Sequence, residues 1–137
     1  MVVSAGVGQA QQPTVLLAFL TTSCAPCQAF WQMLADGAAR AALGTEVVVV
    51  TPSASMENRR AVQRLTPPGL RAHMASGTWF AYGIARAPSF ALVAAGPEGE
   101  VPLGPPGRVL GQASPQSPAE LVALVRSWEA ADKPSRP

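Results

Sequence analysis

Residues 14–27 read TVLLAFLTTSCAPC, and the fold is decided in this stretch. Residues 14–20 are apolar without polar alternation, which predicts a strand that is covered on both faces. The residues that follow switch to helical spacing, and they predict one continuous helix that ends near Gly44. Cys24 and Cys27 therefore lie where a buried strand passes into a helix.

The predicted helix has one apolar stripe that should face the core. Its first turn can be capped by Thr22 or Ser23, because a hydroxyl oxygen there can accept from an unpaired backbone N–H. Gly44 is placed to end the helix, since glycine adopts the left-handed conformation that closes many helices. The stripe comprises Cys27, Phe30, Trp31, Leu34, Ala38, Ala41 and Ala42.

The rest of the chain alternates between predicted strands and helices. A capping box opens the last helix, with Ser117 as the cap, Pro118 at the first helical position and Glu120 in the first turn. The first two buried strands are joined by a helix, so they should run parallel through a right-handed crossover. This order predicts an α/β fold with a mixed sheet. The other predicted strands span 46–51, 70–75, 89–94 and 108–112, and the other helices span 56–65, 78–82 and the segment from 118 onward.

The chain has 137 residues, enough for one domain with a buried core. We expect a flexible segment at 1–13, a domain at 14–129 and a disordered tail at 130–137. Charged residues make up 13%, and the net charge of +2 is too small to indicate a nucleic-acid surface. No run of the sequence approaches the roughly 18 apolar residues that span a bilayer. We therefore expect membrane contact only through an anchor that this sequence does not contain.

The two cysteines are three positions apart, and a bridge between them closes a very small loop. Such a bridge adds little by restricting the unfolded chain, so the pair indicates chemistry more than stability. Unpaired N–H groups and the positive end of a helix stabilise a thiolate, so we expect a lowered pKa for the Cys24 thiol. Cys27 lies about one turn further along and faces the core. We expect Cys24 to attack a disulfide and Cys27 to resolve the mixed disulfide.

Other uses of a C-x-x-C pair fit the sequence less well. Haem attachment requires a histidine directly after the second cysteine, and Gln28 is there instead. A structural zinc site requires four ligands, whereas the chain has two cysteines and one histidine, His73. The pattern around His73 predicts an ordinary surface or edge position. We expect neither a metal nor a cofactor, and a metallochaperone that uses the two thiols is a further alternative.

The sequence resembles the thioredoxin superfamily. Three features carry the resemblance: the C-A-P-C pair between strand and helix, the segment YGIARAPSF at 82–90, and the amphipathic helix at the end of the chain. The resemblance implies a thioredoxin-like fold, with a central mixed sheet flanked by helices on both faces. It also implies that Pro88 is cis and that the backbone of Ala87 hydrogen-bonds an extended substrate. The residues that would support the active site are Ser23, Ala25 and Pro26.

The gap between Cys27 and Pro88 is longer than in a minimal thioredoxin, as in the TlpA-like and methylamine-utilisation-type oxidoreductases. That resemblance implies an extracytoplasmic, monomeric enzyme that reduces or exchanges disulfides in protein substrates and is supplied by an upstream electron donor. A cytoplasmic location stays open. The alternative function is a redox-inert domain that keeps the fold for binding or assembly.

The sequence departs from the family pattern at three positions. Thioredoxins have a tryptophan before the first cysteine and a buried aspartate on the preceding strand, where this chain has Ser23 and Ala18. The tethered relatives place a glutamate three residues after the second cysteine, where this chain has Phe30. The motif region therefore offers no carboxylate to deprotonate Cys27. Peroxiredoxins are neighbours of the family, but their motif needs a proline where this chain has Leu17.

Overall fold

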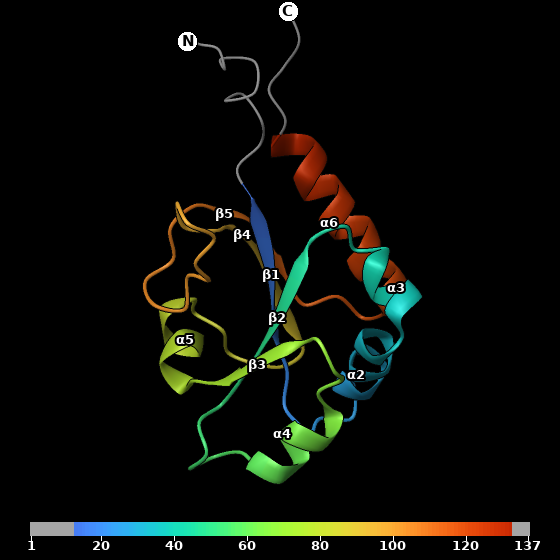
Figure 1. Ribbon diagram of the computed structural model, residues 1–137, viewed down its shortest axis with the longest axis vertical. Coiled ribbons are helices and arrows are strands. Elements are labelled where there is room, and N and C mark those ends of the chain that lie inside the picture. The colour runs from blue at the N-terminus through green and yellow to red at the C-terminus, as the bar shows by residue number, and fades with distance from the viewer. Residues whose placement is uncertain (1–12, 133–137) are drawn as a thin grey trace, which may run out of the picture.

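The computed structural model describes residues 13–132, which form a five-stranded mixed sheet with helices on both faces (Figure 1). The strands lie in the order β3-β2-β1-β4-β5, which confirms the predicted α/β class and the predicted mixed sheet. The strands are β1 (Thr14–Phe19), β2 (Glu46–Thr51), β3 (Arg71–Met74), β4 (Ser89–Ala94) and β5 (Val109–Ala113).

β1 is the central strand, and it pairs parallel with β2 and antiparallel with β4. Leu17 lies opposite Val48 on one side and opposite Ala91 on the other. Every residue of β1 after Thr14 is buried, as a run of apolar residues without alternation predicts. The middle of the sheet therefore holds the strand that leads directly to the two cysteines.

Two apolar clusters lie between the sheet and its helices, one on each face. The helices are α2 (Cys27–Ala35), α3 (Gly37–Ala41), α4 (Arg59–Leu65), α5 (Ser76–Ala81) and α6 (Pro118–Asp132). The first cluster joins Leu16 of β1 to Phe30 of α2 and Leu121 of α6. The second joins Leu17 of β1 to the partly buried Trp79 of α5. Figure 1 accordingly shows α5 on one side of the sheet and α2 and α6 on the other.

The prediction of one continuous helix up to Gly44 is wrong, because the helix is interrupted at Asp36. Asp36 has extended dihedral angles (φ −92°, ψ 113°), and its carboxylate accepts from the N–H groups of Ala38 and Ala39. Aspartate is a preferred N-cap, so it ends α2 and starts α3. Gly44 does have a positive φ of 70°, and Leu43 is buried. The predicted stripe fails in its second half, since the structure exposes Ala38, Ala41 and Ala42.

The helix predicted from residue 56 begins later, at Arg59. The side chain of Asn58 accepts from the Ala61 N–H at 3.0 Å and so caps α4. The preceding residues form a loop after β2, and Met56 within it is 76% exposed. This loop is at the same edge of the sheet as the cysteines, because parallel strands end on the same side.

Ser117 caps α6 as predicted, whereas Glu120 binds the N–H of the residue before the cap. Ser117 Oγ accepts from the Glu120 N–H at 3.2 Å, and the Glu120 carboxylate accepts from the Gln116 N–H at 2.8 Å. Leu121 and Val125 on the apolar stripe are fully buried. α6 therefore covers the first core cluster with the face that its spacing indicated.

The last helix continues to Asp132, which forms an ion pair with Arg108. Residues 130–132, which we expected in a disordered tail, are helical instead. Residues 1–12 and 133–137, where the rest of both flexible ends was predicted, lie outside the described residues. In the part of the chain that the structure describes, no helix is long and apolar enough to cross a membrane.

Candidate active site

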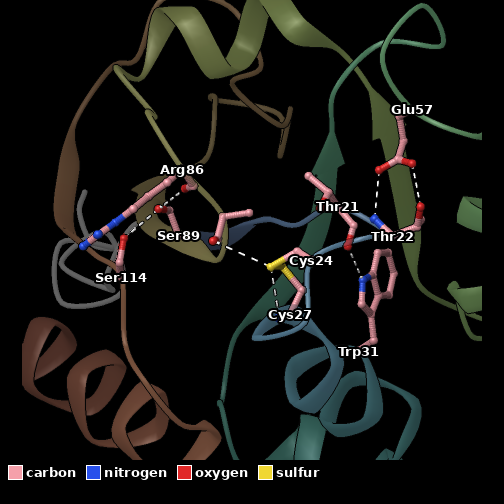
Figure 2. Close-up of a disulfide and its surroundings, with 10 residues drawn as sticks. Thr21, Thr22, Cys24, Cys27, Trp31, Glu57, Arg86, Ser89 and Ser114 are labelled. Atoms are coloured by element: carbon pink, nitrogen blue, oxygen red, sulfur yellow. Dashed lines mark hydrogen bonds between the residues drawn. A yellow bond between two sulfur atoms is a disulfide. The ribbon is translucent and has the colours of Figure 1, made fainter.

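The two cysteines lie in the link between β1 and α2, where they form a disulfide (Figure 2). Their Cα atoms are 5.2 Å apart. Cys27 is fully buried in the core cluster that contains Phe30, whereas Cys24 is half-buried. The structure therefore brings the predicted pair together and exposes Cys24 more than its partner.

α2 begins at Cys27, so Cys24 precedes the helix rather than lying in its first turn. Pro26 is the N-cap and no side chain caps it, so the prediction that Thr22 or Ser23 caps the helix is wrong. The Cys27 N–H instead lies 3.1 Å from the carbonyl oxygen of Cys24 and 3.2 Å from its Sγ. The first N–H of the helix therefore points at the sulfur atom, and a donor in this position favours the thiolate once the disulfide is reduced.

A second segment, 63 residues further along the chain, lies against the same sulfur atom. Sγ of Cys24 is 3.7 Å from the carbonyl oxygen of Ala87. The Ala87–Pro88 peptide bond is cis, as the resemblance implied, and Pro88 is buried just before β4. The structure thus places Ala87 beside Cys24. The substrate-binding roles of Ala87 and Pro88 stay predictions.

The three residues predicted to support the pair are exposed around it. Ser23 directly precedes Cys24, and Ala25 and Pro26 form the turn between the two cysteines. The carbonyl oxygen of Ala25 accepts from the Gln28 N–H at 3.1 Å, which joins the turn to α2. Their position is compatible with a rim around Cys24, and their supporting role stays a prediction.

A carboxylate that the sequence analysis did not identify is hydrogen-bonded to the segment before Cys24. Glu57, in the loop between β2 and α4, accepts from the Thr22 N–H at 2.8 Å and from the Thr22 hydroxyl at 2.6 Å. The family pattern concerns residues in and near the C-A-P-C motif, whereas Glu57 lies in a loop that is remote from it in the sequence. A usable signal existed, because β1 and β2 were predicted to be parallel, and the loops after parallel strands meet at one edge of the sheet.

The pKa of Glu57 is affected by two opposing influences. Partial burial raises it, whereas the hydrogen bonds from the hydroxyl and N–H of Thr22 and from the N–H of Asn58 lower it. The net effect is a pKa below the ordinary glutamate value. Glu57 is therefore a carboxylate at neutral pH, and charged acceptors make stronger hydrogen bonds than neutral ones.

Trp31 of α2 holds the residue next to Thr22. Its indole Nε1 donates to the carbonyl oxygen of Thr21 at 3.0 Å, and the side chain is buried (Figure 2). Two consecutive residues before Cys24 are thus held by side chains from two different elements. The backbone that leads to Cys24 is consequently anchored at two consecutive residues.

The Ala87 segment is held by hydroxyl groups. Ser89 Oγ donates to the carbonyl oxygen of Arg86 at 2.7 Å and lies 2.7 Å from Ser114 Oγ (Figure 2). Ser89 is buried, whereas Arg86 and Ser114 are exposed. These bonds fix the turn that presents Ala87 to Cys24, and they join it to the residue after β5.

The histidine of the chain lies away from the cysteine pair in sequence and in the sheet. His73 is on β3, an edge strand, as predicted, and it is half-buried. Its Nε2 atom is buried and has no hydrogen-bond partner. In residues 13–132 no three side chains of histidine, cysteine, aspartate or glutamate gather in a way that could hold a metal ion.

The fold is similar to that of several solved proteins. The exposed lipoprotein thioredoxin Etrx1 of Streptococcus pneumoniae matches with a TM-score of 0.60 and 15% identity, over 88% of this chain and 89% of that chain. A secreted Mycobacterium tuberculosis disulfide oxidoreductase homologous to E. coli DsbE matches with a TM-score of 0.57 and 20% identity, over 88% and 85%. The N-terminal domain of PilB from Neisseria gonorrhoeae matches with a TM-score of 0.56 and 16% identity, over 95% and 89%.

These similarities show that the fold is thioredoxin-like, as the sequence resemblance implied. They cover most of each chain. No protein-family model matches the sequence, and no curated protein sequence matches it.

Proposed function

We propose that the chain is a thiol–disulfide oxidoreductase that works through Cys24 and Cys27. One observation carries this proposal: a disulfide joins a half-exposed Cys24 to a fully buried Cys27, and the first N–H of α2 points at Sγ of Cys24. A bridge over three positions contributes little to stability, so its position at the protein surface favours chemistry. The thioredoxin-like fold adds support, because the solved proteins that share it include a disulfide oxidoreductase by name.

The reaction proceeds by two exchanges of a disulfide. The Cys24 thiolate attacks one sulfur atom of a substrate disulfide, a mixed disulfide forms, and the first substrate thiolate leaves. The Cys27 thiolate then attacks Sγ of Cys24 and releases the second substrate thiolate. The substrate gains two electrons, and the chain is left with the Cys24–Cys27 disulfide. A dithiol donor must return two electrons before the next cycle.

The substrate side of the reaction uses the Ala87 segment. An extended peptide beside Cys24 would meet the backbone of Ala87, whose carbonyl oxygen is 3.7 Å from Sγ of Cys24. Pro88 is buried, whereas Ser23, Ala25 and Pro26, the neighbours of Cys24 in the sequence, are exposed and open to a protein substrate. Recognition through the backbone fits a range of protein disulfides, because it reads no particular side chain.

We place the enzyme outside the cytoplasm, as a monomer. The structural neighbours support this location, since one is named an exposed lipoprotein and another is named secreted. The partners are then exported proteins with disulfides and an upstream dithiol donor. The turn between the cysteines is Ala25-Pro26 and lacks the histidine of strongly oxidising relatives, so the proposed direction is reduction or exchange.

Turnover of a protein disulfide tests the proposal. The reduced chain should reduce the insulin disulfides when a small dithiol is supplied, and counting free thiols should show two thiols per chain before reaction and none after oxidation. Cys24→Ser is the matched control and should show no turnover. A wild-type chain that keeps its disulfide but does not accelerate insulin reduction would favour the redox-inert binding domain instead.

A further inference from the structure

Glu57 connects two parts of the chain that are far apart in sequence. It lies in the loop between β2 and α4, and Thr22, which it binds, is 35 residues away and two residues before Cys24. Both carboxylate oxygens are used: Oε2 accepts from the Thr22 N–H at 2.8 Å, and Oε1 accepts from the Thr22 hydroxyl at 2.6 Å. The backbone and side-chain donors of Thr22 thus bind to a single carboxylate (Figure 2).

The carboxylate is itself held in place. The Asn58 N–H donates to Oε1 of Glu57 at 2.7 Å, and the side chain of Asn58 caps α4 through the Ala61 N–H. Glu57 is therefore attached to the start of a helix, and turning its side chain away would break all of these bonds to its oxygens. Because the Glu57 carboxylate is held by its own loop, it can in turn restrain the position of Thr22.

We propose that Glu57 is a positioning residue for Cys24, a role that rests on the proposed redox function. By binding both donors of Thr22, the carboxylate fixes the backbone that enters the turn at Cys24. That backbone sets the direction from which the Cys27 N–H meets Sγ of Cys24, a contact of 3.2 Å. Glu57 thus acts on the sulfur through Thr22 and not by transferring a proton.

The proposed positioning role of Glu57 depends on its hydrogen bonds and not on ion pairs with charged neighbours. Within the described part of the chain no arginine, lysine or histidine forms an ion pair with Glu57. Arg59 and Arg60 follow on α4 and are exposed. The hydrogen bonds from Thr22 and Asn58 outweigh the effect of burial and keep the pKa of the carboxyl below its ordinary value. The acceptor therefore stays charged over the pH range in which thiols react.

Four variants separate positioning from charge and from general stability. Thr22→Val removes the hydroxyl but keeps the side-chain shape, the backbone N–H and the charge of Glu57. Thr22→Ser keeps the hydroxyl and is its matched control. Glu57→Ala removes the whole interaction. Glu46→Gln removes a carboxylate at the opposite end of β2, where it pairs with Arg71, and controls for the loss of one charge.

The measurement is the alkylation rate of Cys24 in the reduced chain as a function of pH, which needs no substrate. Glu57→Ala should move the thiolate midpoint to higher pH and slow alkylation below the midpoint about fivefold, because a hydrogen bond to sulfur is weakened. Thr22→Val should move it in the same direction by less. Thr22→Ser and Glu46→Gln should match the wild type.

Two results would overturn the positioning role. An unchanged midpoint in both Glu57→Ala and Thr22→Val would show that the segment needs no anchor. A lower midpoint in Glu57→Ala would show that the carboxylate acts on the thiolate through its negative charge. If Glu57→Ala does not fold, the comparison of Thr22→Val with Thr22→Ser decides alone. Absence of insulin turnover in the wild type would refute the proposed function, and the alkylation profiles would still report on Thr22 and Glu57.

Discussion

Two segments meet at the disulfide, and they are held in different ways. The segment before Cys24 is anchored from a distance, because Thr22 binds the charged Glu57 and Thr21 binds the buried Trp31. The segment before β4 is held by neutral hydroxyls, chiefly Ser89, which bonds the carbonyl of Arg86 only three residues away. The sulfur atom that is proposed to attack thus lies next to a segment held by a carboxylate that titrates, whereas the proposed substrate-binding backbone is held by groups that do not.

Because of this difference, the Cys24 segment and the Ala87 segment can respond differently to a change of pH. Protonation of Glu57 removes acceptors from Thr22 and leaves the bonds of Ser89 intact. A change that acts on the Cys24 side should therefore alter the reactivity of the sulfur. A change on the Ala87 side should alter how a protein substrate is held.

The largest effect should come from the cysteines, which define the contact between the two segments. Cys27→Ser should accumulate mixed disulfides with protein partners, because Cys24 can still attack but the resolving thiol is gone. Cys24→Ser should form none, because the buried Cys27 is inaccessible. Non-reducing electrophoresis of each variant after incubation with oxidised insulin measures this. Adducts formed equally by both variants would reverse the assigned roles.

Trp31→Phe should have the next largest effect and should act on the Cys24 side alone. The substitution removes the Nε1 donor to Thr21 and leaves a gap in a buried position, so the free energy of unfolding should fall by about 2 kcal/mol. Denaturant unfolding checks it. Since tryptophan carries no titrating group, the loss should be equal at pH 7 and pH 4. A loss that varies with pH would indicate coupling to Glu57.

The parts of the fold that could be predicted from sequence depend on local patterns. β4 has the predicted bounds, because the apolar run after Pro88 ends at a turn signal. The pair Cys24 and Cys27 was placed at a strand-to-helix junction by spacing alone. The break at Asp36 was missed because the alanines after it continue a helical pattern that the capping carboxylate interrupts.

The missed part of the candidate site depends on tertiary contacts. Glu57 lies among arginines in the sequence, and that composition indicates a solvated helix face. Its loop is brought to Thr22 by the pairing of β1 with β2, which no local window contains. Periodicity identifies the elements and a motif identifies the sulfur atoms, whereas the side chains that hold those elements together come from elsewhere in the chain.

Ser89→Ala should have a smaller effect, confined to the Ala87 side. Ser89 is buried and bonds both Arg86 and Ser114, but those two residues are exposed and water can replace the lost hydroxyl. The free energy of unfolding should therefore fall by about 1 kcal/mol, without dependence on pH. Insulin turnover should fall more than the alkylation rate of Cys24. An equal fall in both would show that the two segments are not independent.

Glu57→Gln should have the smallest effect on stability. Its pH dependence is the sharpest test of the difference between the Cys24 segment, held by a carboxylate, and the Ala87 segment, held by hydroxyls. The folded-state pKa of Glu57 is depressed, so its contribution to stability is complete above the unfolded-state pKa of a glutamate. That contribution is lost as the pH falls through the lower, folded-state pKa. The wild type should therefore be more stable than Glu57→Gln at pH 7, and the difference should shrink below the ordinary glutamate pKa and vanish at still lower pH. Ser89→Ala, measured in parallel by denaturant unfolding, should keep its deficit throughout. A Glu57→Gln deficit that is constant with pH would show that the amide disturbs the loop sterically and that the carboxylate charge does not stabilise the Thr22 contact.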